Sequence, residues 1–180
     1  MYTLVRKTLE IYLTDKRVPT LSDIPSEITP FLSSKEAVFV TIYHEWKVIA
    51  SSGRINCKKE NSVYECIDNT LMCLKDPRFT LQIQDPALLS SLSIRVDRFL
   101  PTGRRVLASL VDLDPRKEWL ILLSQNFGTL SVILPHMIHT DITADNLFHL
   151  ACKKANIDLQ KITPTDYVLY GLTTITESDF

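Results

Sequence analysis

The stretch that decides the fold runs from Ala37 to Phe79 and reads AVFVTIYHEWKVIASSGRINCKKENSVYECIDNTLMCLKDPRF. It opens with an apolar run at residues 37–43, whose β-branched and aromatic side chains favour a buried strand. A polar turn at His44–Glu45 separates this run from a second one at 46–50. The pattern therefore predicts two consecutive strands, followed by the small-residue turn 51–53.

A helix is expected to follow from about Ser62. The spacing Ser62-x-x-Glu65 has the form of a capping box, in which a hydroxyl and a carboxylate satisfy end amides reciprocally. The helix should end at Asp76, because Pro77 disfavours helical backbone at the residue before it. Strand, strand, turn, helix and a Pro-Arg corner together predict one wall of a cleft.

The remaining elements do not alternate regularly between strand and helix. We predict an α+β fold with a mixed, mostly antiparallel sheet packed by helices. The alternation in 92–98 predicts a strand with one buried and one wet face. Arg95, Asp97 and Arg98 mark the wet side or an edge, and a proline-glycine break at 101–103 should end the strand. The expected helices are 2–16, 62–76 and 143–155, the last capped by Thr143, and the further strands are 92–98, 118–123, 129–134 and 167–176.

Composition limits the classes of function. Hydrophobic content is 45%, charged content is 23% and the net charge is -1, which is ordinary for a globular protein. With so small a net charge, the protein as a whole has no positive electrostatic potential that would attract nucleic acid or an anionic membrane. The chain lacks an apolar run long enough to span a bilayer and a signal-peptide pattern at its start. Together with four cysteines that show no Cys-x-x-Cys spacing, this predicts a cytoplasmic protein with reduced thiols.

Two short motifs could carry chemistry. Ser51-Ser52-Gly53 could expose a hydroxyl beside backbone amides, as an acyl-transfer nucleophile requires, but a turn that needs small residues explains it as well and is favoured. Arg78, held by the corner Asp76-Pro77-Arg78-Phe79, could offer a bidentate fork to a carboxylate or phosphate. The favoured alternative is structural, with Arg78 paired to a local carboxylate and Phe79 in the core.

A third constellation is His136-x-x-His139 with His149-x-x-Cys152. These four side chains are zinc-competent and could close a tetrahedral site. However, Pro135 and the Thr140-Asp141 break make the first pair non-helical. We therefore favour surface or packed histidines, and we expect no metal and no cofactor.

The order of these signals resembles the AMMECR-one (AMMECR1) domain family over nearly the whole chain. In that family the strand beginning Phe-Val-Thr is followed by a Leu-Arg-Gly-Cys-Ile-Gly motif. Here Val48-Ile49-Ala50-Ser51-Ser52-Gly53 takes its place, so Ile49 stands for the arginine and Ser51 for the cysteine. The matching pieces are 37–41, 76–79, 92–96, 120–122, 134–135 and 150–155.

The resemblance implies a single domain over residues 1–180, with a main lobe, a smaller β-rich lobe from roughly 100–135 and a cleft between them. The lobe boundary is expected near Pro101 or Pro115. It also implies that a Memo-type domain or a radical-SAM protein is a possible partner, because some relatives are fused to the first or occur alongside the second. The expected cleft residues are Ser51, Ser52, Gly53, Asp76, Arg78 and His136.

Two functions follow as hypotheses. The first is a non-catalytic or partner-dependent module whose cleft binds a peptide, protein or small ligand, because the fold pattern is intact while the Cys-Arg motif is lost. The second is a divergent hydrolase or group-transfer enzyme with Ser51 as nucleophile and Arg78 as anion clamp. The second needs a base close to Ser51, and His44 is the nearest in sequence. Nucleic-acid binding is not expected.

Overall fold

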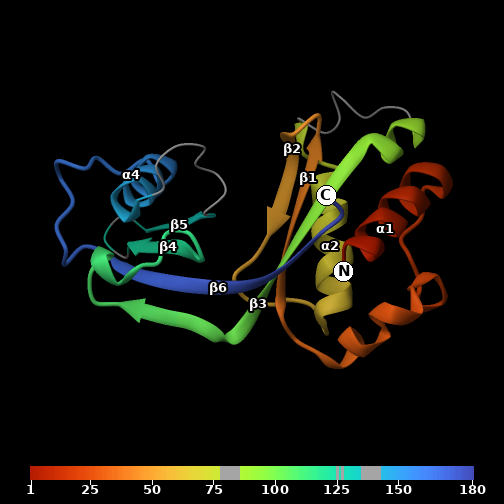
Figure 1. Ribbon diagram of the computed structural model, residues 1–180, viewed down its shortest axis with the longest axis horizontal. Coiled ribbons are helices and arrows are strands. Elements are labelled where there is room, and N and C mark those ends of the chain that lie inside the picture. The colour runs from red at the N-terminus through yellow and green to blue at the C-terminus, as the bar shows by residue number, and fades with distance from the viewer. Residues whose placement is uncertain (78–85, 125, 127, 135–142) are drawn as a thin grey trace. The chain divides into compact units, whose positions relative to one another are not determined.

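The computed structural model of the chain describes residues 1–77, 86–124, 126, 128–134 and 143–180. The chain divides into two compact units. Unit 1 comprises Met1–Phe99 with Ile175–Phe180, and unit 2 comprises Leu100–Thr174. Figure 1 follows the chain through both units, and each is described by itself below.

The strands follow one another in the order β2-β1-β3-β6-β4-β5. The pairings β1–β2, β1–β3, β4–β5 and β4–β6 are all antiparallel, so the predicted α+β class with a mostly antiparallel sheet is confirmed. β3 and β6 each cross the boundary between the units. The strand bounds are β1 Ala37–His44, β2 Lys47–Gly53, β3 Leu92–Leu107, β4 Glu118–Ser124, β5 Thr129–Ile133 and β6 Val168–Ser178.

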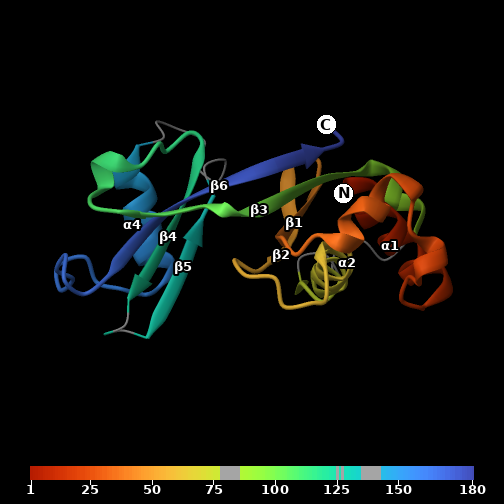
Figure 2. The ribbon, with the colours of Figure 1, turned by 90° about the horizontal axis from the view of Figure 1, so that it is seen from below.

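In unit 1, helices α1 (Tyr2–Asp15) and α2 (Ser62–Cys73) lie on the same side of the β1–β2 hairpin, as Figure 2 shows. Alternate strand residues point toward these helices, as the two-residue period of a strand requires. The resulting core combines strand residues with the inner faces of both helices: Leu4, Val5, Leu9, Val38, Val40, Ile42, Ile49, Ala50, Val63, Cys66, Ile67, Ile94 and Val96. We call this side of the strands the helix face and the opposite side the outer face.

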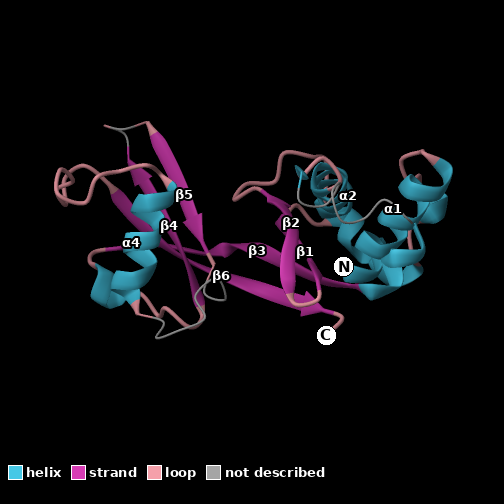
Figure 3. Ribbon diagram, turned by 90° about the horizontal axis from the view of Figure 1, so that it is seen from above, coloured by secondary structure: helices cyan, strands magenta, loops and turns pink. Residues whose placement is uncertain are grey.

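In unit 2, helix α4 (Ala144–Lys154) packs against β4 and β5, and Figure 3 shows the helix beside these strands. Its predicted cap is confirmed, since the Thr143 hydroxyl accepts a hydrogen bond from the Asn146 N–H at 3.2 Å. The core of this unit includes Leu120, Leu122, Ile133, Leu147, Ala151 and Cys152.

The described chain also contains 3-10 helices, namely η1 Leu21–Asp23, η2 Ser26–Ser33, η3 Pro86–Ser91 and η4 Leu110–Asp112. Among the described helices, none combines the length and the apolar character that a membrane crossing requires.

The predicted capping box of α2 is wrong. The N-cap is Asn61, whose side-chain oxygen accepts from the N–H groups of Val63 and Tyr64, both at 3.1 Å. An asparagine cap is worth about 1 kcal/mol relative to alanine. The Ser62 hydroxyl instead accepts from the Glu36 N–H at 2.7 Å, and Glu65 is left for a different set of partners.

Strand β3 also differs from its prediction. It continues unbroken through Pro101 and lies between β1 and β6 rather than at an edge. Asp97 and Arg98, expected on a wet side, are 0% and 9% exposed. Ion pairs make their burial tolerable, because Arg95 bonds to Asp97 at 2.9 Å and Arg98 bonds to Glu177 at 3.2 Å.

The β1–β2 turn lies one residue later than predicted. His44 pairs with Lys47, so the turn residues are Glu45 and Trp46. Both have positive φ, 48° and 64°, as the favoured two-residue hairpin turn requires at both central positions. Neither residue is a glycine or asparagine, so sequence preference did not indicate this turn.

Candidate functional site

A β-bulge in β2 decides which residues of the segment 48–53 share a face. The register pairs Tyr43 with Val48 and Ile42 with Ala50, so Ile49 is the extra residue. Both Ile49 and Ala50 are 0% exposed and belong to the helix-face core. In an ordinary strand, positions 49 and 51 would share a face. The bulge instead turns Ile49 inward, so the position of the family arginine lies in the core, apart from Ser51.

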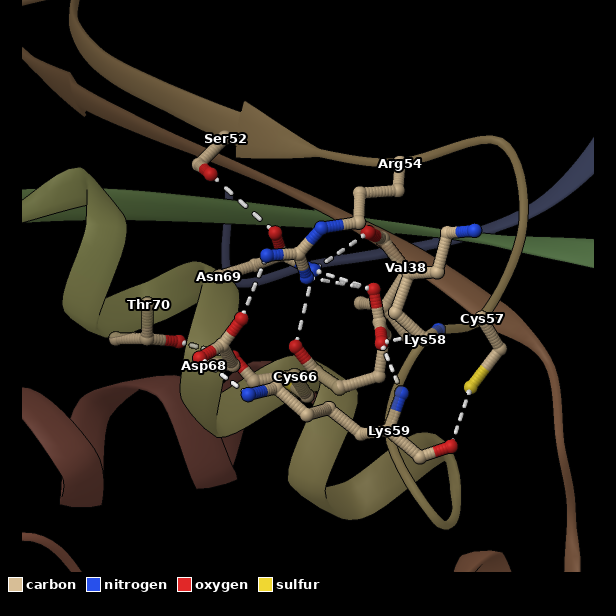
Figure 4. A network of polar contacts seen from close by, with 11 residues as sticks. Val38, Ser52, Arg54, Cys57, Lys58, Lys59, Cys66, Asp68, Asn69 and Thr70 are labelled. Carbon is tan, nitrogen blue, oxygen red and sulfur yellow. Dashed lines mark hydrogen bonds and ion pairs between the residues drawn. The ribbon is translucent and has the colours of Figure 1, made fainter.

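Ser52 faces the helices and belongs to a polar network with α2, shown in Figure 4. Its hydroxyl donates to the Asn69 side-chain oxygen at 3.3 Å. The Asn69 amide nitrogen donates to the Val38 carbonyl at 3.1 Å and to the Glu65 carbonyl at 2.9 Å. Asn69 therefore joins β1, β2 and α2 through one side chain.

Arg54 extends this network directly after β2. Its two amino groups donate to Glu65 at 3.0 Å and to Asp68 at 2.7 Å, and Lys59 approaches Asp68 at 2.9 Å. The Glu65 carboxylate also accepts from the N–H groups of Lys58 and Lys59, at 2.8 and 2.9 Å. Two cations face two carboxylates, so the helix-face network is closed by the chain itself.

The Glu65 side chain is 0% exposed, and its ionisation reflects this setting. Burial by itself raises the pKa of the Glu65 carboxyl. Hydrogen bonds from Arg54 and from the two backbone amides outweigh burial, so the pKa of Glu65 is lowered overall. Glu65 is thus held as a carboxylate, and its role is to fasten the 54–60 loop to α2.

Ser51 points the opposite way, onto the outer face. It pairs with Thr41 of β1, and Thr41 pairs with Arg95 of β3. Directly opposite residues have Cβ atoms roughly 5 Å apart, so Ser51, Thr41 and Arg95 form one row across three strands. We call this the outer row.

Arg95 is the charged member of the outer row and is 19% exposed. Its Nε and one amino group, Nη2, donate to the two carboxylate oxygens of Asp97, each at 2.9 Å. Nη2 also reaches the Thr176 hydroxyl at 3.4 Å, and Thr176 donates to Asp97. The fixed fork of Arg95 is therefore preorganised, and its charge is balanced by a fully buried carboxylate.

Thr41 is 2% exposed. Its buried hydroxyl nevertheless has no hydrogen-bond partner in the described part of the chain. An unpaired buried hydroxyl costs about 1–3 kcal/mol, so its presence calls for an explanation. The Ser51 hydroxyl beside it is half-buried and likewise bonds to no described residue. Two neighbouring hydroxyls on the outer face thus bond to no residue within the described ranges.

Aromatic side chains flank the outer row. Tyr43 and Phe39 lie two residues to either side of Thr41 on β1, roughly 7 Å along the strand, and both share its face. Phe39 covers Gly53, since a Cβ there would lie 2.1 Å from the Phe39 ring and 2.6 Å from the Phe39 Cα. Glycine is required by this contact. A few polar groups between aromatic rings is the usual character of a ligand site.

Four of the six predicted cleft residues, Ser51, Ser52, Gly53 and Asp76, lie in the part of the chain that the structure describes. Ser51 lies on the outer face, whereas Ser52 lies on the helix face. Asp76 follows α2, where its N–H donates to the Cys73 carbonyl at 3.0 Å. Arg78 and His136 lie outside the described residues, so their convergence on Ser51, and the predicted cleft between two lobes, stay predictions.

His44 does not supply a base for Ser51. It lies three residues beyond Thr41 on β1, roughly 10 Å along the strand, and its register position is on the helix face. No described histidine or carboxylate hydrogen-bonds the Ser51 hydroxyl. The requirement of the nucleophile hypothesis is therefore not met within the described chain.

The zinc-competent residues can be followed for one pair, because His136 and His139 lie outside the described residues. His149 is exposed, and Cys152, four-fifths of a helical turn further on, is buried in the core of unit 2. Burial raises the pKa of the Cys152 thiol. No group of three metal-competent side chains occurs among the residues that the structure describes.

Two hollows lie away from the outer row. One of about 340 Å³ lies beside α1, where the Arg6 fork is already bound to Asp179 at 2.7 Å and to the Leu89 carbonyl at 3.0 Å. The other, about 530 Å³, is an open surface beside the end of α4. The first is lined by Arg6, Leu9, Glu10, Ala87, Leu89 and Ser90 among others, and the second includes His149, Lys153 and Asp158.

Sequence reasoning missed Thr41 and Arg95 as neighbours of Ser51. The alternation in Leu92-Ser93-Ile94-Arg95-Val96 did indicate the face of Arg95. It could not give the register between β1 and β3, because the paired residues Thr41 and Arg95 are far apart in the sequence.

Comparison with known proteins agrees with this architecture. The crystal structure of an uncharacterised protein, PH0010 from Pyrococcus horikoshii, matches with a TM-score of 0.80 and 18% identity, covering 97% of this chain and 87% of that chain. At this identity the likeness shows the fold alone. No curated protein matches the chain. The AMMECR1 family model matches residues 2–174, so the chain belongs to the AMMECR1 family.

Proposed function

We propose that this AMMECR1 protein is a non-catalytic, partner-dependent binding module that uses the outer row of unit 1. The observation that carries the proposal is the Thr41 hydroxyl, which is buried and unpartnered within the described chain. It stands in register with the half-buried Ser51 and with the preorganised Arg95. Polar groups that the described chain does not satisfy are the groups that a bound molecule can satisfy.

The same segment gives less support to catalysis. A serine hydroxyl becomes a useful nucleophile when an adjacent base takes its proton, and the described chain places none beside Ser51. The position that holds arginine in the family motif is the core residue Ile49. Serine in place of the family cysteine removes reactivity, and isoleucine in place of the family arginine removes charge. Strand β2 and the outer row are present nonetheless.

The partner is expected to be a protein or a ligand that a protein delivers. Memo-type and radical-SAM proteins, which the family resemblance brings as context, are the first candidates. A cytoplasmic location is part of this proposal.

The test is affinity capture from an extract of the source organism with quantitative mass spectrometry. Wild type is compared with Ser51→Trp, which fills the outer row, and with Met72→Trp, which places the same side chain at a 43% exposed position of α2. We expect partners that Met72→Trp retains and Ser51→Trp loses. Ser51→Asn, a smaller change, shows whether a loss follows from blocking rather than unfolding, with melting temperature measured for all variants.

Equal capture by wild type and Ser51→Trp would contradict the proposal. So would turnover by the isolated chain that Ser51→Ala abolishes together with labelling by a serine-reactive probe. That second result would instead establish the hydrolase or group-transfer alternative.

A further inference from the structure

We infer that the hollow at the end of α4 binds a small organic anion, a carboxylate attached to an apolar group. This is the hollow of about 530 Å³, which is lined by His149 and Lys153 of the helix and by the segment 156–160 that follows it. Its volume lies in the range of small-molecule sites. All of its residues belong to unit 2, so the inference is independent of the outer row and goes beyond the proposed function.

The hollow forms where the chain reverses after α4. Asn156 has a positive φ of 56°. Its N–H donates to the Lys153 carbonyl at 3.1 Å, and the Ile157 N–H donates to the Cys152 carbonyl at 2.9 Å. These are the two bonds of a Schellman motif, and Ile157 and Cys152 are both buried in the core of unit 2. The motif directs residues 158–160 past the helix, so their side chains share a hollow with its last turns.

Side chains that can donate hydrogen bonds line this space. His149 and Lys153 are one turn apart on the same side of α4, with Cβ atoms roughly 6 Å apart. Both are exposed, and neither bonds to a residue within the described ranges. The side-chain amides of Asn156 and Gln160 are unbonded in the same sense. An imidazole keeps an N–H donor in either charge state, so four donor groups from two segments open onto one hollow.

The charges of the hollow favour an anion. Lys153 carries a full positive charge and pairs with no described carboxylate. Asp158 carries the opposite charge, but it accepts from the Gln160 N–H at 3.0 Å and lies 3.4 Å from the Lys161 ammonium. The end of a helix adds roughly half a negative charge, and the two Schellman bonds already occupy two of its last carbonyls. An anion therefore gains a charge-assisted hydrogen bond, which is about twice as strong as a neutral one.

The apolar part of the ligand is inferred from Leu159. This side chain is 42% exposed and lines the hollow together with Lys153. A ligand with a charged end and an apolar body uses both, whereas an inorganic anion would use the donors alone. A carboxylate has two acceptor oxygens, and its single negative charge matches the single lysine that lines the hollow.

The hollow beside α1 does not offer this combination. The Arg6 fork is bound to Asp179 at 2.7 Å and to the Leu89 carbonyl at 3.0 Å. The Glu10 carboxylate is paired with Lys7 at 3.0 Å. The charged groups on that rim are thus engaged within the chain, whereas the hollow at the end of α4 has a cation and three further donors that no described residue engages.

The test is an NMR titration of the ¹⁵N-labelled full chain with three probes. Benzoate has a carboxylate on an apolar ring, acetate has the charge without the ring, and benzamide has the ring without the charge. We expect saturable shifts of the Lys153 backbone amide and of the Asn156 and Gln160 side-chain N–H₂ signals with benzoate, and binding about fivefold weaker or less for the other two. Equal or tighter binding of benzamide would overturn the anion class, and equal or tighter binding of acetate would overturn the apolar part.

Three variants give a second readout in which the predicted effects have opposite signs. Lys153→Gln removes the cation, so the benzoate affinity should fall about tenfold. Asp158→Asn removes a repelling charge, so the affinity should rise about threefold. Lys117→Gln is the control, because it removes the same charge as Lys153→Gln from an 81% exposed position that does not line the hollow. Its benzoate affinity should equal that of wild type, and melting temperatures are measured for all three.

Undiminished affinity of Lys153→Gln would refute the inference. An equal loss in Lys117→Gln would also refute it, because benzoate would then respond to net charge rather than to a site. Shifts that do not saturate, or that are confined to other parts of the chain, would have the same meaning. None of these results bears on the outer row, so the proposed function stands or fails by its own test.

Discussion

Ser51 and Ser52 are adjacent serines and both are half-buried, yet they lie in two different environments. Ser52 faces the helices and donates to Asn69, within a network whose charges are paired. Ser51 faces away from them and stands beside Thr41, whose buried hydroxyl has no described partner. The hydrogen bonds on the helix face of β2 are satisfied within the chain, whereas the outer face carries hydroxyls that no described residue satisfies.

The difference shows how function can be separated from stability within a single strand. The helix face fixes the position of β2 through Asn69, Arg54 and the buried Glu65. Because the strand is already held in place, binding on its opposite face does not require the loss of conformational entropy that ordering a flexible segment would cost, and this favours binding. We therefore expect changes on the helix face to alter stability, and changes on the outer face to alter binding.

The largest effect is expected for Glu65→Gln. A glutamine keeps one acceptor oxygen and replaces the other by an N–H₂ group, so a donor meets either Arg54 or the two amides of Lys58 and Lys59. Breaking a buried ion pair in this way should lower the free energy of unfolding by about 3 kcal/mol. Urea unfolding measures it, with Glu10→Gln as the exposed control, for which a change below about 0.5 kcal/mol is expected.

A loss below about 1 kcal/mol for Glu65→Gln, or equal losses for the two variants, would show that the helix face is not held by this carboxylate. The helix face could then no longer be described as the face of β2 that determines stability.

Gly53→Ala should have the next largest effect. The added Cβ would lie 2.6 Å from the Phe39 Cα, a backbone atom that cannot rotate away. Overpacking of this kind costs about 1–3 kcal/mol. We expect a loss of about 2 kcal/mol by urea unfolding, against almost none for Ser51→Ala two residues earlier. Full stability of Gly53→Ala would mean that Phe39 does not lie over this glycine.

Acid should produce a smaller loss than Glu65→Gln at the same side chain, because the hydroxyl oxygen of a protonated carboxyl can still accept a hydrogen bond, whereas the N–H₂ group of glutamine can only donate. The pKa of Glu65 is lowered in the folded protein, with the cost of burial outweighed by hydrogen bonds from Arg54, Lys58 and Lys59. Its stabilising contribution is thus complete above the unfolded value, about 4.3 for glutamate, and is lost as the pH falls through the folded pKa.

Chemical denaturation between pH 6 and pH 3 measures this dependence, and Glu65→Gln should flatten it. An unchanged pH dependence in the variant would assign the acid loss to other carboxylates, of which Asp68 is the nearest with a lowered pKa, again against the effect of burial.

Local signals were enough to predict most of the fold. The apolar run 37–43 predicted β1, and the alternation in 92–98 predicted the start of β3, because a two-residue period is a direct consequence of strand geometry. The errors fall where tertiary context overrides a local rule. Pro101 was expected to end β3, and Asp97 was expected in water, but partners distant in sequence make both conformations tolerable.

The site was predictable in part only. The sequence singled out Ser51 because it stands at the family cysteine position, and the structure places it in the outer row beside Thr41. The bulge at Ile49 and the neighbours Thr41 and Arg95 were not predictable, because a single unpaired residue changes the face of everything before it. Sequence spacing within one strand does not reveal such an insertion.

The smallest effect is also the most direct test of the comparison, and it needs two alanine substitutions side by side. Ser52→Ala removes the donor to Asn69, so it should cost about 0.5–1 kcal/mol, the net worth of an ordinary hydrogen bond. Ser51→Ala removes a hydroxyl without a described partner, so the free energy of unfolding should change by less than about 0.5 kcal/mol. If Ser51→Ala is the more destabilising of the two, the outer hydroxyl has a structural partner and the row is not available to a ligand. If the order is as expected, unfolding cannot explain a loss of partner binding in Ser51→Ala that the less stable Ser52→Ala does not share.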